Sequence, residues 1–151
     1  MQRGIATFEV ILAALIIALL ASVAVPNVNR VVDRVALDYE TKRLYTDLRA
    51  LQAFDRMTNM RDSHFGFADD ESVKLVIYPE RYDFEKNSNG KIYSTHYFSN
   101  GVTADKSMIV KFDDMGKVSP AISDTLYLTS RLGKRNSIVF DSVGRFKGGR
   151  Q

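Results

Sequence analysis

The stretch IATFEVILAALIIALLASVAV, residues 5–25, followed by Pro26, decides how this chain folds. From residue 10 to residue 25, sixteen consecutive residues include one polar side chain, Ser22. About 20 helical residues, each rising about 1.5 Å, cross the hydrocarbon core of a bilayer, which is about 30 Å thick. The sequence therefore predicts a membrane-spanning helix and a head that is smaller than the 151 residues suggest.

Insertion of this segment into a membrane is favourable even with its acidic residue, Glu9, charged. Twelve of residues 5–25 are Leu, Ile, Val or Phe, each contributing roughly 0.3 to 0.6 kcal/mol, against a penalty of about 3 kcal/mol or less for a carboxylate near one end. Arg3 precedes the segment and a mixed group of charges follows it. The positive-inside rule favours a cytoplasmic N-terminus with the head outside the cytoplasm.

Two other interpretations fit the apolar run. The first is a secretory signal peptide, since Ser22-Val23-Ala24 resembles a cleavage site, but Glu9 and the nearby Pro26 argue against it. The second is a plain signal anchor. An ionisable residue within a membrane segment is by default a functional residue, because its burial must be offset by a partner.

The run Arg3-Gly-Ile-Ala-Thr-Phe-Glu9, with the apolar segment and Pro26 behind it, resembles the class III signal of type IV prepilins and pseudopilins. The resemblance implies that a prepilin peptidase cuts between Gly4 and Ile5 and methylates the new terminus at Ile5. Glu9 then becomes the fifth mature residue and Pro26 the twenty-second, as in the family. The sequence departs from the usual pattern in its Ile5-Ala6 start and its leader of four residues, 1–4.

The spacing between Glu9 and the new terminus has a physical explanation. The amine at Ile5 would be a cation in apolar surroundings, and Glu9 lies about one helical turn further on. In a staggered stack, Glu9 of one subunit can neutralise the amine of a neighbour and fix the axial register. The alternative is that Glu9 only reaches for the membrane interface.

Pro26 marks the end of the membrane segment. It lacks an amide hydrogen and clashes with the carbonyl one turn earlier, so a helix that passes through it should kink. The alternative is a helix that ends at Val25 and restarts with Pro26 in its first turn.

After Pro26, apolar residues recur at helical spacing with charged residues between them, which predicts an amphipathic continuation over residues 26–57 that ends near Arg56. We expect Leu44, Leu48 and Leu51 of this half to lie on a sheet.

From residue 72 the apolar period changes to two, and turn residues separate the apolar runs. The expected fold class is α+β, with a long N-terminal helix packed on a small antiparallel β-sheet head that occupies residues 58–151. The expected strands are 73–78, 91–98, 108–112, 125–129, 137–141 and 145–147. The turns expected between them are 87–90, 100–101, 113–116, 133 and 142–144. The pattern of the last 45 or so residues resembles the head of the GspH/FimT-like minor pseudopilins.

The remaining composition excludes several chemistries. The chain has no cysteine, and its two histidines, His64 and His96, have no spacing typical of a metal site or a catalytic triad. The acidic runs 69–71 and 113–114 are more typical of solvated turns than of calcium loops. We expect no cofactor, no metal site and no catalytic residue.

Two functional hypotheses follow. The resemblance implies a minor pilin or pseudopilin of a type IV pilus, type II secretion or DNA-uptake filament, whose partners are the membrane, the prepilin peptidase, other subunits and the assembly machinery. The alternative is a DNA-binding subunit, because the net charge of +3 is concentrated near the C-terminus. The candidate nucleic-acid contacts are Lys134, Arg135, Arg145, Phe146, Lys147 and Arg150.

Overall fold

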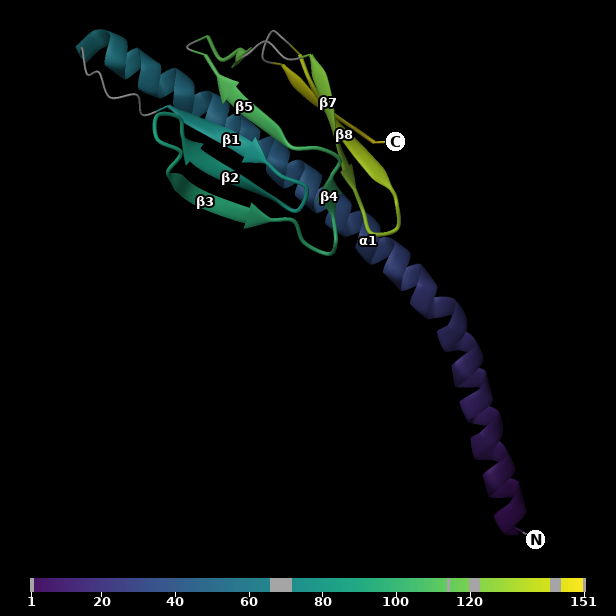
Figure 1. Cartoon of the computed structure of the whole chain (residues 1–151). Helices are drawn as coiled ribbons and strands as arrows, with labels where there is room; N and C mark the ends of the chain where they lie inside the picture. Colours follow the sequence, from purple (N-terminus) through teal and green to yellow (C-terminus); the bar gives the residue numbers. More distant parts are fainter. Residues whose placement is uncertain (1, 66–71, 114, 120–122, 142–144, 151) are drawn as a thin grey trace.

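The computed structural model describes residues 2–65, 72–113, 115–119, 123–141 and 145–150. One long helix, α1 (Gln2–Phe65), carries a head built from two antiparallel sheets. Figure 1 shows the head on the C-terminal part of α1, while the N-terminal part projects as a stalk. The coarse expectation of an α+β layout with one long N-terminal helix is confirmed.

The helix is continuous through Pro26, so the alternative in which it ends at Val25 is wrong. The expected end near Arg56 is also wrong, because α1 continues to Phe65. The loss of apolar periodicity after residue 57 does not stop the helix: no glycine or proline follows until Gly66. Below the head, in the dark blue part of the ribbon, α1 changes direction (Figure 1).

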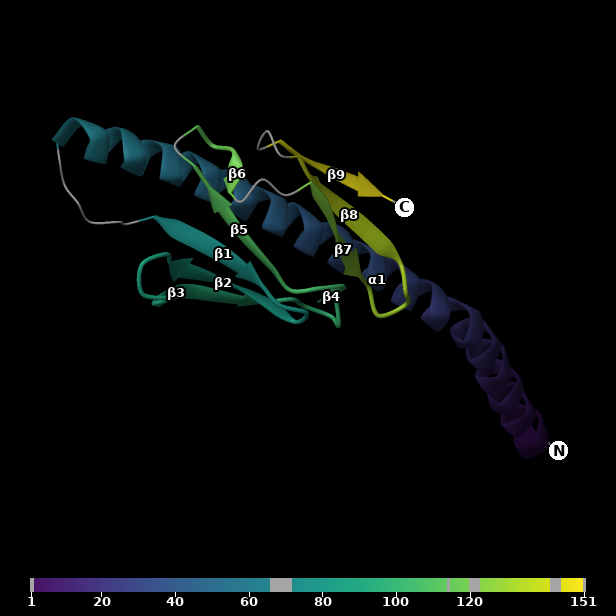
Figure 2. The same ribbon diagram turned by 45° about the horizontal axis from the view of Figure 1, so that its top comes forward.

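The first sheet has the strand order β3-β2-β1-β5-β6, and the second has the order β4-β7-β8-β9. The strands of the first sheet are β1 (Val73–Ile77), β2 (Arg81–Lys86), β3 (Ile92–Tyr97), β5 (Met108–Phe112) and β6 (Val118–Ser119). Those of the second are β4 (Thr103–Ala104), β7 (Asp124–Thr129), β8 (Arg135–Phe140) and β9 (Phe146–Arg150). Figure 2 shows both sheets packed along the same part of α1.

The expected strands correspond to β1, β3, β5, β7, β8 and β9, with shifts of a few residues at their ends. Sequence analysis missed β2 and the two-residue strands β4 and β6. In β2, charged residues alternate with Tyr82 and Phe84, and the density of charge conceals a period of two. The structure places β2 inside the first sheet, between β1 and β3.

The core lies between one face of α1 and the inner faces of the sheets. Leu44 and Leu48 are fully buried and Leu51 nearly so, as expected for the half of the helix that packs on a sheet. Tyr82 and Phe140 are the largest of the fully buried side chains that the structure describes, one from each sheet. Both sheets therefore share a single core with the helix.

Four of the expected turns contain a glycine with positive φ. Gly116, with φ of 73°, has a left-handed backbone that favours glycine, and a Cβ there would also displace the guanidinium of Arg56. That guanidinium donates to the Met115 carbonyl oxygen at 3.1 Å and ties the β5–β6 turn to the helix. The expected turn at 142–144 lies outside the described residues.

Candidate functional site: the apolar stalk and the polar anchors of the head

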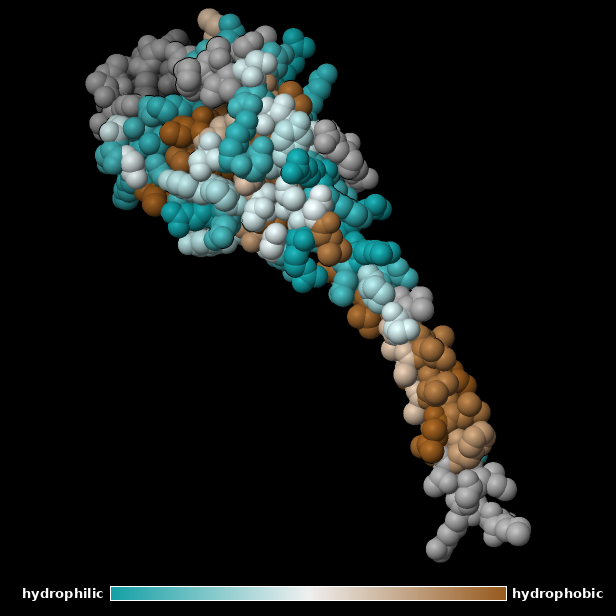
Figure 3. Space-filling view, turned by 45° about the vertical axis from the view of Figure 1, so that its right-hand side comes forward, coloured by the Kyte–Doolittle hydropathy of each residue, from teal (hydrophilic) through white to brown (hydrophobic). Residues whose placement is uncertain are grey.

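The stalk presents its apolar side chains to the surroundings. In residues 8–25, every side chain that the structure describes is exposed, and Figure 3 shows this surface as a continuous apolar column below the polar head. One helix near the N-terminus is long and apolar enough to cross a membrane, and none of its apolar window is buried within the molecule. An exposed apolar surface of this extent is typical of a region that interacts with a membrane or with another protein.

The N-terminal residues singled out by sequence are all helical in backbone conformation. Gly4 and Ile5 lie within α1. Glu9 is exposed on the stalk, and it has no hydrogen bond or ion pair among the side chains that the structure describes.

The acidic residues in the C-terminal part of α1 differ from Glu9, because they face the head and form hydrogen bonds with it. Asp33 accepts a hydrogen bond from the Ser130 hydroxyl at 2.6 Å, and Asp38 accepts one from the Asn136 amide at 3.0 Å. Asp47 accepts from the Tyr82 hydroxyl at 2.5 Å. These bonds fasten α1 to the loop after β7, to β8 and to β2 respectively.

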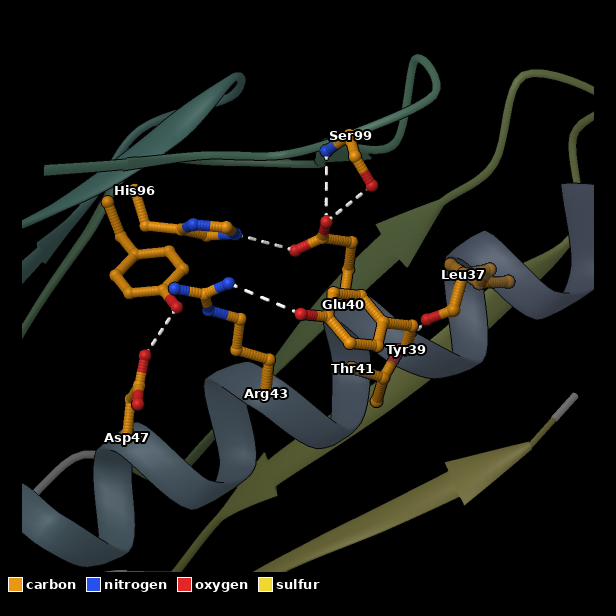
Figure 4. Close-up of polar contacts among 9 residues, drawn as sticks. Leu37, Tyr39, Glu40, Thr41, Arg43, Asp47, His96 and Ser99 are labelled. Atoms are coloured by element: carbon orange, nitrogen blue, oxygen red, sulfur yellow. Dashed lines mark hydrogen bonds and ion pairs between the residues drawn. The ribbon is translucent and has the colours of Figure 1, made fainter.

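Glu40 is the most heavily bonded of these anchors (Figure 4). Its side chain is fully buried, and one oxygen accepts from the Ser99 amide at 3.0 Å and from the Ser99 hydroxyl at 2.6 Å. The other oxygen lies 2.8 Å from Nε2 of His96. Burial raises the pKa of Glu40, but the hydrogen bonds from Ser99 and His96 outweigh it, so the pKa is lowered overall.

The geometry around Glu40 is that of a structural anchor. Ser99 and His96 both bond to the carboxylate, whereas a Ser-His-acid relay needs the serine to donate to the histidine. His96 was expected to be an ordinary strand residue, and it does lie in β3, half-buried between Glu40 and the Tyr82 ring. His64 has no described side chain.

Tyr82 and Arg43 lie beside this anchor; Figure 4 labels Arg43 together with Tyr39 and Asp47. Burial, together with the hydrogen bond to Asp47, raises the pKa of Tyr82 far above its ordinary value, so the hydroxyl remains a donor. The Arg43 guanidinium donates to the Tyr39 hydroxyl at 3.3 Å, which raises the pKa of Arg43.

The basic residues of the same helix segment are exposed, although the guanidinium groups of Arg49 and Arg56 also contact the head. Residues 30–56 contain six basic and five acidic residues, a nearly neutral sequence. All six bases are exposed, whereas every acid is buried or half-buried. They are Arg30, Arg34, Lys42, Arg43, Arg49 and Arg56. The exposed charges of this part of α1 are consequently basic, which the mixed sequence does not reveal.

The candidate nucleic-acid residues lie along the β8–β9 hairpin. Arg135 starts β8, and Arg145 and Lys147 flank or belong to β9; all three are exposed. Lys134 is half-buried, and its amide donates to the Ser130 hydroxyl at 3.1 Å. The backbone of Arg150 pairs with that of Asn136, so the chain returns to the Lys134 end of the hairpin. The side chain of Arg150 lies outside the description.

Phe146 does not fit the role that sequence analysis gave it. Its side chain is only 4% exposed, and it packs on Tyr45 with ring centroids 5.0 Å apart. The guanidinium of Arg49 lies 5.1 Å from the centroid of the same ring. A base cannot stack on Phe146 while the ring remains in the core, so this contact is withdrawn from the candidate set.

The described residues contain no group of three or more side chains suited to hold a metal ion. Asp113 instead accepts from the amides of Met115 and Lys117, at 3.0 and 2.7 Å, which is the behaviour of a turn residue. Residues 69–71 and Asp114 lie outside the description.

Comparison of the chain with protein-family models, with curated proteins and with solved structures found no match.

Proposed function

We propose that this chain is a pilin-like subunit, a minor pilin or pseudopilin of a filament used for a type IV pilus, type II secretion or DNA uptake. A prepilin peptidase cuts between Gly4 and Ile5 and methylates Ile5. The subunit waits in the cytoplasmic membrane with its head outside the cytoplasm and then enters the filament. It has a structural role and catalyses no reaction.

The observation that supports this proposal is the combination of motif and exposure. Gly4, Ile5, Glu9 and Pro26 have the spacing of the prepilin signal, and they lie on a helix whose apolar stalk has no cover within the molecule. The same helix then becomes the core of the head. A filament needs such a helix: its stalk binds neighbours, and its other end displays the head.

Glu9 has the central role in assembly. After cleavage, the amine of Ile5 and the carboxylate of Glu9 are both charged in apolar surroundings. A pair formed between neighbouring subunits removes both penalties and sets the axial register. Since Glu9 has no partner among the described side chains, its charge is available for this contact.

The intact mass of the mature protein, isolated from a host with prepilin peptidase, tests the processing step. We expect a chain that starts at N-methylated Ile5. A chain that starts at Val25 would instead make it an ordinary secreted protein, and one that retains Met1 would make it a simple anchor.

Assembly is tested separately with Glu9→Leu, measured as incorporation into sheared filaments. We expect incorporation to fall at least tenfold, because the neighbouring amine loses its partner. Ser22→Ala, which changes another polar residue of the stalk, should incorporate normally. Undiminished incorporation of the Glu9 variant would remove the role of this charge.

The DNA-binding alternative is favoured by one observation, the exposed row of Arg135, Arg145 and Lys147 along the hairpin, with Arg150 returning beside it. Neutralising Arg145, Lys147 and Arg150 should abolish binding of double-stranded DNA at low salt, since phosphate contacts dominate such affinity. A matched triple variant at Lys74, Lys86 and Lys91 removes equal charge from the other sheet and should bind normally. Unchanged binding by the first variant would exclude this hypothesis.

A further inference from the structure

The outer edge of β3 is free of any strand that the structure describes. β3 pairs with β2 on one side and is the terminal strand of the first sheet. The Phe98 amide donates to the Glu80 carbonyl oxygen at 2.9 Å, towards β2. Because the direction alternates along an antiparallel strand, the amides of Thr95 and Tyr97 point to the free edge. These groups offer hydrogen bonds to an incoming backbone.

The other edges of the two sheets have features that discourage pairing. β4 and β6 are each two residues long. β9 contains Lys147 and the glycine pair 148–149. β3 differs from all of these, because its six residues, IYSTHY, include no Lys, Arg, Asp, Glu, Pro or Gly. Long uncharged edges of this kind bind other strands unless something prevents it.

A cavity of about 410 Å³ opens beside β3, between α1 and the inner face of the first sheet. Its walls include the aromatic rings of Phe54, Phe84 and Tyr93. Two small residues, Ala50 on the helix and Ser94 on β3, are also among its walls. The register of the ladder between β2 and β3 also shifts between Phe84 and Glu85, next to the cavity.

We propose that the free edge of β3 binds an extended segment of another protein as an added strand, with a bulky apolar side chain of that segment in the cavity. The backbone groups of β3 require an extended partner, since a helix has no free backbone groups to pair with them. The apolar, aromatic lining selects an apolar side chain. Tyr93, which is 54% exposed, and Phe54, which is 46% exposed, are the surfaces that the partner covers.

A second copy of this chain fits the edge poorly. Among the described strands, a copy offers one long uncharged edge, its own β3. Since β3 runs roughly along α1 (Figures 1 and 2), antiparallel β3–β3 pairing points the two stalks in opposite directions. Two subunits anchored in the same membrane cannot adopt that arrangement. This argument rests on the proposed function, in which the stalk is inserted in a membrane. Parallel pairing would place Lys91 beside its own copy.

The edge is tested with the full-length chain in lipid nanodiscs and two fluorescent peptides, Thr-Val-Thr-Phe-Thr-Val-Thr and the same peptide with glycine in place of phenylalanine. Binding is measured by anisotropy. We expect the phenylalanine peptide to bind at least tenfold more tightly than the glycine peptide, because its ring enters the cavity. Failure of the phenylalanine peptide to bind would overturn the proposal.

Two pairs of variants locate the contact. Thr95→Pro removes an outward amide and leaves the ladder to β2 intact, so affinity should fall at least tenfold, whereas Thr95→Ala keeps the amide and the affinity. Ala50→Leu fills the cavity and should abolish the preference for phenylalanine. Ala53→Leu adds the same side chain to the same helix outside the cavity lining and should preserve the preference. Equal binding by Thr95→Pro would overturn the proposal.

Hydrogen exchange of the wild-type chain gives a test that needs no variant to fold. The phenylalanine peptide should slow exchange of the Thr95 and Tyr97 amides at least tenfold, and unchanged exchange would overturn strand addition. Sedimentation of the chain without peptide identifies the competing occupant. If the chain forms a dimer that Thr95→Pro abolishes, the β3 edge binds a second copy of the chain and the proposed partner segment is excluded. The mass measurement that tests cleavage after Gly4 does not depend on this result.

Discussion

The carboxylates of α1 show how much the function of a residue depends on its neighbours. Asp33, Glu40 and Asp47 are each seven residues apart, the same spacing as Leu37, Leu44 and Leu51. A repeat of seven residues keeps a set of side chains on nearly one side of a helix. The acids therefore lie beside the buried leucines, in the interface between α1 and the head. There they accept hydrogen bonds from hydroxyl and amide groups.

Glu40→Gln tests the strongest of these anchors. At neutral pH the variant should lose about 2 kcal/mol of the free energy of unfolding, because the donors of Ser99 and His96 lose a charged acceptor. The pKa of Glu40 is lowered on folding, so its contribution is complete above its ordinary value of 4.5 and is lost as pH falls through the lower folded value. The difference between the two proteins should accordingly shrink in acid.

Urea denaturation of the full chain in detergent, followed by the near-ultraviolet circular dichroism of tyrosine, measures this difference at several pH values. Glu80→Gln, at an exposed position, is the control and should change stability by less than about 0.5 kcal/mol. If Glu40→Gln lost the same free energy of unfolding at every pH, the charge of Glu40 would not be what stabilises the head.

Sequence reasoning missed these anchors at the residue scale for a physical reason. A charged residue between leucines on a helix is ordinarily solvated, so Asp33 and Arg34 look equivalent. Asp33 is buried because it accepts hydrogen bonds from donors far along the chain, such as Ser130. A local sequence pattern cannot predict such donors. The seven-residue spacing of the acids was the available signal.

At the scale of elements, α1 divides into two parts with different partners. Leu48 is fully buried under the sheets, whereas Val35 is 61% exposed on the same helix. Leu48→Ala should lower the free energy of unfolding of the head by about 3 kcal/mol, because it leaves a cavity in the core. Val35→Ala should change it by less than about 0.5 kcal/mol in the same denaturation experiment. Equal losses would mean that the head covers more of α1 than the structure shows.

The effect of Pro26 on the direction of α1 is also a property of the whole element. Because proline removes one helical hydrogen bond and crowds the preceding turn, Pro26→Ala should straighten α1 and lengthen the distance between its two parts. Pulsed electron resonance between spin labels at positions 14 and 42, both exposed, measures that distance. Val28→Ala, which leaves the proline in place, is the control. An unchanged distance in the Pro26 variant would assign the bend to another cause.

Most elements could be predicted from the sequence, and the misses have separate causes. The stalk and the strands β1, β3, β5 and β7 follow from composition and a period of two. β2 was missed because its charged residues, including the buried Asp83, disguise the alternation. The division of the head into two sheets and the pairing of β1 with β5 depend on contacts between distant segments, which periodicity does not encode.

At the scale of the whole molecule, the structure separates an apolar stalk from a self-contained head. The earliest residue of α1 that bonds to the head is Asp33 among those described. A chain that begins at Asn29 should therefore be a soluble monomer that unfolds cooperatively, since it lacks the apolar segment and keeps every described anchor. Sedimentation velocity and thermal circular dichroism check this expectation. Aggregation of the shortened chain would show that the stalk is needed for the head to fold.

The uninterrupted path of α1 from the stalk into the core has a mechanical consequence. A pull on the stalk along its axis loads the carboxylate contacts together, since Asp33, Glu40 and Asp47 stand about 10.5 Å apart along that axis and each grips a different segment. Because all three acids lie on one helix, these contacts resist such a pull in parallel. Tension that enters at the N-terminal end of α1 is thus shared across three segments of the head.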